Sequence, residues 1–167
     1  GNISVAAGAT LNFAPVGAGS VRFSGTGPQA ISNLGTLGFS STQNVVILNS
    51  AGVTLNNPVT IQGILTLTSG LLNTTAVNLL TMSAGSSVAG SSNASFINGP
   101  VKKIGNTPFT FPVGKANGLV PLRVSNFAGA SAPTDEFTAE YIRASASALG
   151  AVTALLIDHV SHCEYWT

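Results

Sequence analysis

The side chains that could carry nucleophilic or acid-base chemistry lie close to the end of the sequence. Asp158, His159 and Ser161 are the residue types of a hydrolase triad, and His162 with Cys163 are those of a thiol nucleophile or a metal site. Adjacent residues of a strand point to opposite faces, so neither group can converge within one extended segment. A metal site also needs three or four converging ligands. We predict no catalytic residue, no metal ligand and no cofactor site here, and we expect Cys163 to be packed.

Carboxylates are the second group with chemical potential. Glycosidases use a pair of carboxylates, and Ca²⁺ takes six to eight oxygens, usually with several carboxylates among them. Asp135-Glu136 and Glu140 are the other concentrations, and Thr134 to Glu136 is one calcium candidate, but solvated strand edges explain these residues better. Residues 1–101 contain no Asp, Glu, His or Lys. Because that region can supply neither an acid nor a base, we predict that the protein is not an enzyme and rank a polysaccharide-degrading β-helix third.

Two binding functions need no ionisable group. An outward threonine array could order water at an ice surface, and aromatic rings could stack on a glycan. The threonines are Thr54, Thr60, Thr66 and Thr68, and the aromatic residues are Tyr141, Tyr165 and Trp166. Threonine is also an ordinary residue on the solvent face of a strand, and a chain with few large residues tends to bury them. Glycan or ice binding is therefore the alternative function.

A short strand pattern recurs in the middle of the sequence, and the rest of the chain is organised around it. Val53-Thr54-Leu55, Val59-Thr60-Ile61 and Leu65-Thr66-Leu67 follow one another at equal intervals. Each triplet places two apolar side chains on one face and a threonine on the other, as a strand requires. Asn, Pro and Gly between the triplets turn the chain and oppose a helix. The pattern predicts a coil of short parallel strands.

Similar segments recur over the whole first part of the chain. The turns begin near Asn2, Val21, Thr42, Gln62 and Thr81. Their period is about 20 residues, at the short end of the range for stacked repeats. We therefore predict a single-stranded parallel β-helix of about five rungs over residues 1–103. Uneven turn lengths favour the right-handed form, although the spacing of the triplets suits the left-handed hexapeptide form. The asparagines at the bends, Asn49, Asn56, Asn57 and Asn73, are expected to be structural.

The pattern changes after residue 103 to longer alternating runs. Phe109 to Val113, Leu122 to Val124, Phe137 to Tyr141 and Val160 to Trp166 are predicted antiparallel strands. They favour a small β-sandwich-like domain over residues 104–167, which we expect to be incomplete at its C-terminus. Residues 144–157 are expected to form a loop with one helical turn. The predicted fold class is all-β.

Composition limits the partners. Only 7% of the residues are charged and the net charge is +1, so no basic footprint for nucleic acid or anionic lipid is present. No apolar run is long enough for a membrane span, and no signal-peptide pattern begins at Gly1. We predict neither a nucleic-acid partner nor membrane insertion.

Several strings occur in an order that resembles a known module. AGVTLNNPVTIQGILTLTSGLLNTT, FINGPVKKIGNTPFTFPVGK, FTAEYIRA and HCEYWT are similar to a module repeated in very large secreted surface proteins of Bacteroidetes-type bacteria, including adhesin-like proteins. The resemblance covers most of the chain and implies an extracellular, cell-surface location with a structural or adhesive role. It carries over no catalytic motif.

The expected function is that of a non-enzymatic module in a surface fibre. The first rung carries no cap, and an incomplete sandwich can accept a strand by β-augmentation, so we expect head-to-tail contacts with copies of the chain or with adjacent modules of the same polypeptide. Surface glycans are the other expected partner.

Overall fold

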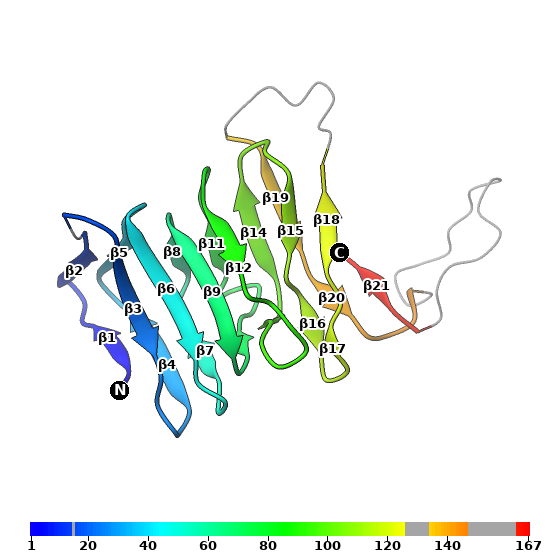
Figure 1. Ribbon diagram of the computed structural model, residues 1–167, viewed down its shortest axis with the longest axis horizontal. Helices are drawn as coiled ribbons and strands as arrows, with labels where there is room; N and C mark the ends of the chain where they lie inside the picture. Colours follow the sequence, from blue (N-terminus) through cyan, green and yellow to red (C-terminus); the bar gives the residue numbers. More distant parts are fainter. Residues whose placement is uncertain (15, 126–133, 147–162) are drawn as a thin grey trace.

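The computed structural model describes residues 1–14, 16–125, 134–146 and 163–167. The chain is all-β and forms a parallel β-solenoid of about four turns, followed by small antiparallel sheets (Figure 1). Each complete coil contributes one strand to each of three sheets, so strands that are neighbours in space are three apart in chain order. The coils stack along the long axis of the molecule, with the N-terminus at one end (Figure 1).

The three sheets of the solenoid, named A, B and C, differ in how they end. Sheet A consists of β1 (Ile3–Val5), β4 (Gln29–Asn33), β7 (Val53–Leu55), β10 (Leu72–Asn73) and β13 (Ile97–Asn98). Sheet B consists of β2 (Thr10–Phe13), β5 (Thr36–Phe39), β8 (Val59–Ile61), β11 (Leu80–Met82), β14 (Val101–Ile104) and β19 (Glu136–Ala139). Sheet C consists of β3 (Gly19–Phe23), β6 (Gln43–Leu48), β9 (Ile64–Ser69) and β12 (Ser87–Ala89). All neighbours are parallel except β19, which runs antiparallel to β14 and closes sheet B.

The three threonine triplets are the three sides of one coil, as the sequence predicted. They form β7, β8 and the middle of β9. The six aliphatic side chains of the triplets are buried: Val53, Leu55, Val59, Ile61, Leu65 and Leu67. Stacking of equivalent strands places these side chains in continuous ladders, where backbone hydrogen bonds run between coils and apolar groups meet inside.

Coil length varies more than the sequence analysis expected. Successive partners in the ladders of sheet A are Ile3 with Ile31, Gln29 with Val53, Val53 with Leu72, and Leu72 with Ile97. The step from Ile3 to Ile31 is the longest of these, and the step from Val53 to Leu72 is the shortest. Corner segments take no part in the ladders, so their length is free to vary. The solenoid makes about four turns, and five strands are stacked in sheet A.

The antiparallel strands expected after residue 103 are present among the described residues, but they pair two by two. β15 (Phe109–Phe111) pairs with β18 (Leu122–Val124), β16 (Gly114–Lys115) with β17 (Gly118–Leu119), and β20 (Tyr141–Ile142) with β21 (Tyr165–Trp166). The predicted strand from Phe137 to Tyr141 is divided, because β19 joins sheet B whereas β20 pairs with β21. Residues 147–157 of the expected loop, and residues 160–162 of the last expected strand, lie outside the described residues.

The hydrophobic core continues across residue 103. It extends from Phe23 in the first coil to Ala139 and Tyr141 near the other end. Phe109 and Phe111 belong to the same core, and their rings meet edge to face with centroids 4.9 Å apart. The two predicted domains therefore share one core.

Candidate functional site

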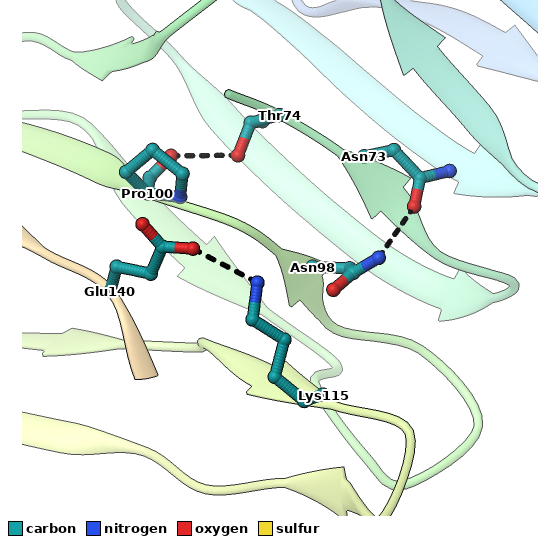
Figure 2. A network of polar contacts seen from close by, with 6 residues as sticks. All are labelled: Asn73, Thr74, Asn98, Pro100, Lys115 and Glu140. Atoms are coloured by element: carbon teal, nitrogen blue, oxygen red, sulfur yellow. Dashed lines mark hydrogen bonds and ion pairs between the residues drawn. The ribbon is translucent and has the colours of Figure 1, made fainter. Parts of the chain in front are cut away.

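Three of the described carboxylates of the C-terminal region, those of Glu136, Glu140 and Glu164, are engaged with neighbouring side chains. Lys102 Nζ lies 2.6 Å from Glu136 Oε2. Lys115 Nζ lies 2.9 Å from Glu140 Oε1 (Figure 2). The described part of the chain holds no group of three or more His, Cys, Asp and Glu residues suited to a metal ion. In the calcium candidate, Thr134 to Glu136, the last residue begins β19, and its carboxylate forms the ion pair with Lys102.

The other residues with nucleophilic or acid-base potential fall into two groups. Asp158, His159, Ser161 and His162 lie outside the described residues. Cys163 is exposed, so the expectation that its thiol would be packed is wrong. It precedes β21 and lies outside the residues that pair with β20.

Tyr141 is buried and donates a hydrogen bond from its hydroxyl to Glu164. That hydrogen bond, followed by burial, raises the pKa of the Tyr141 phenol above its usual 10.0. The phenol keeps its proton and donates a hydrogen bond to the carboxylate, so the two residues form a structural pair. It fastens β20 to the segment that leads into β21.

The aromatic residues proposed for glycan binding do not form a common platform. Tyr141 is buried, Tyr165 is half-buried, and Trp166 is 41% exposed. The rings of Tyr141 and Trp166 are tilted against each other with centroids 5.7 Å apart, and Trp166 Nε1 donates to the carbonyl of Val120 at 3.4 Å. Trp166 thus presents a single exposed ring, and the hydrogen bond from its Nε1 to Val120 stabilises the position of that ring.

The threonines proposed for an ice-binding array point in three directions. Thr54 lies on sheet A, Thr60 on sheet B, and Thr66 and Thr68 on sheet C. On sheet B the ladder position of Thr60 is continued by Thr81 and then by Lys102. The threonines do not share one face.

The asparagines at the bends form hydrogen bonds between and within coils. Asn98 Nδ2 donates to Asn73 Oδ1 at 3.0 Å on the outer face of sheet A, and Thr74 Oγ1 donates to the carbonyl of Pro100 at 2.8 Å (Figure 2). Asn49 is fully buried and donates to Gln29 Oε1 at 2.8 Å. Hydrogen bonds of these amides stabilise the corners, whose conformation the stacked aliphatic side chains do not determine.

Lys103 is a feature that the sequence analysis did not single out. Its side chain points inward, at the ladder position after Met82, and only 1% of the residue is exposed. The ammonium group donates to the carbonyl oxygens of Ser83 and Ser86 and lies 5.3 Å from the centroid of the Phe109 ring. Burial lowers its pKa below the usual 10.5. Strand alternation could have revealed it, because Val101 is inward and Lys103 is the next residue on the same face.

The first coil carries one outermost strand of each of the three solenoid sheets. β1, β2 and β3 are the outermost strands of sheets A, B and C, and each is paired on one side only. Arg22 is the one charged side chain on these three strands. Leu11, an inward residue of sheet B, is 37% exposed there. We take these three strands as the candidate functional site, since their outer edges suit hydrogen bonding to a further strand.

The parallel coils define the chain as a β-solenoid protein. No protein-family model, curated protein or solved structure matches it. No helix in the described part of the chain is long and apolar enough to cross a bilayer.

Proposed function

We propose that this chain is a non-enzymatic structural module of an extended assembly on the outside of a bacterial cell. In this proposal the solenoid is a rigid spacer, and modules join end to end. The resemblance of the FTFPVGK and CEYWT strings to repeated surface modules supports the location. The proposal assigns no catalytic role to any residue.

The observation that carries the proposal is the composition of the solenoid wall. Residues 1–101 include one ionisable side chain, Arg22, whereas the outer face of sheet A presents amides and hydroxyls such as Asn73, Asn98 and Thr54. Hydrogen bonds between coils occupy several of these groups, as between Asn73 and Asn98. A wall held together by such hydrogen bonds, with almost no ionisable side chain, suits a spacer.

Labelling of intact source cells with an antibody against the purified protein tests this proposal. We expect labelling of cells that have not been permeabilised and no hydrolysis of polysaccharides by the purified protein. Labelling that appears only after permeabilisation would contradict the cell-surface location, and polysaccharide cleavage would contradict the structural role.

Glycan binding is the second candidate function, because the exposed ring of Trp166 could stack on a sugar. A glycan array probed with the wild-type chain and with Trp166→Ala separates the two functions. Binding that is lost in Trp166→Ala would favour the glycan-binding module over the spacer.

A further inference from the structure

The turn between β16 and β17 carries an Asn-Gly pair at its tip. Lys115 and Gly118 pair across the turn, and Ala116 and Asn117 form the loop between them. Asn117 is exposed, whereas Gly118 is buried and has a φ of 114°, which side-chain-bearing residues rarely adopt. The turn therefore favours glycine after Asn117. Because glycine has no side chain, nothing on Gly118 itself blocks a group that approaches its peptide nitrogen.

The amide of Asn117 is in contact with a cation. Arg143, which follows β20, donates a hydrogen bond from Nη1 to Asn117 Oδ1 at 2.6 Å. The guanidinium keeps its charge at any pH at which the protein folds. The two other ionisable side chains that meet at this turn and β20, Lys115 and Glu140, form an ion pair at 2.9 Å and offset each other's charge (Figure 2). Arg143 therefore polarises the carbonyl of the Asn117 amide.

A polarised amide carbonyl is open to attack by the peptide nitrogen of the next residue. Attack moves negative charge onto Asn117 Oδ1, which is the atom that Arg143 contacts, so the guanidinium stabilises the transition state. The nucleophile and the carbonyl belong to adjacent residues, and no second molecule has to be held in place. The pairing of Lys115 with Gly118 must open first. Because β16 and β17 have two residues each, this opening is local.

The chain contains a second Asn-Gly pair in a different setting, Asn98-Gly99. Asn98 lies in β13, and its Nδ2 donates to a neutral partner, Asn73 Oδ1, at 3.0 Å. Its main-chain carbonyl accepts from Thr74 N at 3.2 Å, and a Cβ on Gly99 would lie 2.3 Å from Thr74 O. The neighbouring coil thus fixes the backbone on both sides of Asn98. This pair serves as a comparison within the same molecule.

We propose that Asn117 is a self-modification site, at which Arg143 promotes conversion of the side-chain amide to a carboxylate. The Gly118 nitrogen loses its proton to the solvent and bonds to Cγ of Asn117. The bond from Cγ to Nδ2 breaks, and this nitrogen takes a proton from the solvent and leaves as ammonia. Water then opens the cyclic imide by breaking one of its two bonds to nitrogen. The net reaction consumes one water and releases one ammonia, and nothing is oxidised or reduced.

The product differs from the starting chain in charge and in backbone length. Breaking the bond between Cγ and nitrogen gives aspartate, and breaking the main-chain bond gives isoaspartate, which adds one carbon to the backbone of the turn. Either carboxylate lies beside Arg143, so a hydrogen bond to a neutral amide becomes an ion pair between the turn and the segment after β20. The net charge falls from +1 to zero. This chemistry is independent of the proposed spacer role.

Incubation of the purified chain in mildly alkaline buffer, followed by peptide mass spectrometry, tests the proposal. A protease that cuts after phenylalanine releases residues 97–109 with Asn98 and residues 110–127 with Asn117, and fragment spectra place the change from amide to acid. We expect aspartate and isoaspartate to accumulate at Asn117, and about tenfold more slowly at Asn98. A folded chain that keeps its Asn117 amide, or that loses it no faster than that of Asn98, would overturn the proposal.

Two variants separate the role of Arg143 from that of overall charge. Arg143→Gln removes the cation, and we expect Asn117 to react about tenfold more slowly. The matched control, Arg123→Gln, removes the same charge from β18, whose pairing partner is β15, and we expect the wild-type rate. In concentrated urea, where the contact with Arg143 is lost, all three chains should react equally. Equal rates of the folded wild type and Arg143→Gln would overturn the proposal, as would equal slowing by Arg123→Gln.

Discussion

Lys103 shows how one residue can end an aliphatic ladder. Its side chain lies in line with Met82, where one more aliphatic residue would continue the core. The ammonium group instead reaches the turn formed by Ser83 to Ser86, in which Ser86 N donates to Ser83 O at 3.1 Å. Buried ammonium groups are tolerated where acceptors replace water, and two backbone carbonyls do so here. Lys103 thus connects the corner of the fourth coil to the last strand of the solenoid.

The lowered pKa of Lys103 predicts that stability rises with pH. The usual pKa of 10.5 applies to the unfolded chain, so between the lower folded pKa and 10.5 the unfolded state binds a proton that the folded state does not. The free energy of unfolding therefore increases with pH through that window. We expect urea unfolding from about pH 8 to 10 to show this increase in the wild type and not in Lys103→Met. Equal slopes for both chains would show that Lys103 does not titrate in this way.

Gly70 and Gly85 form a matched pair that separates backbone strain from crowding. Both have positive φ, at 80° and 78°. A Cβ on Gly70 would lie 1.7 Å from the carbonyl oxygen of Asn49, whereas a Cβ on Gly85 would have no atom within 4 Å. We expect Gly85→Ala to cost about 1 kcal/mol, and Gly70→Ala at least about 2 kcal/mol more, in thermal unfolding. Similar destabilisation by the two substitutions would show that the backbone at Asn49 moves to make room for the added methyl group.

At the scale of elements, strand alternation made the central coil predictable from sequence. Thr54, Thr60 and Thr66 mark the outer face of three successive strands, and the residues beside them are buried. Coil spacing was harder to predict because the corners vary in length. The joining of β19 to sheet B could not be predicted either. The sequence pattern of an antiparallel strand does not indicate which sheet edge the strand will pair with.

The alternation predicts opposite outcomes for two adjacent residues. Ile61→Asp places a carboxylate in the core, where Ile61 is 2% exposed, and we expect a loss of about 4 kcal/mol or failure to fold. Thr60→Asp changes an exposed residue on the outer face of β8, and we expect a change within about 0.5 kcal/mol. Urea unfolding compares the two, and equal damage would contradict the inward and outward assignment.

At the scale of the whole molecule, the solenoid and the C-terminal strands behave as one unit in their packing. Phe109, Phe111 and Tyr141 share the core that begins in the first coil. The ion pair between Lys102 and Glu136 spans β14 and β19. The candidate site at the first coil was partly predictable, because the sequence from Asn2 to Phe13 indicated strands without charged residues. Which of its peptide groups face the second coil depends on the register of the ladders, and that register came from the structure.

A shared core predicts a single unfolding transition. Trp166 is the one tryptophan of the chain and lies against Tyr141, so its fluorescence reports the C-terminal strands. Far-ultraviolet circular dichroism mainly reports the solenoid. We expect the two signals to change at the same urea concentration, as in a two-state protein. Two separate midpoints would show that residues 1–103 and 104–167 unfold independently.

The scarcity of charged residues in the solenoid wall also affects cleavage of the protein by proteases. Proteases of the trypsin type cut after lysine or arginine, and between Arg22 and Lys102 the chain contains neither. The segment between these two residues therefore offers such a protease no peptide bond to cut, whether the coils are folded or open. Resistance of this kind belongs to the covalent chain and survives denaturation, unlike the protection that packing gives.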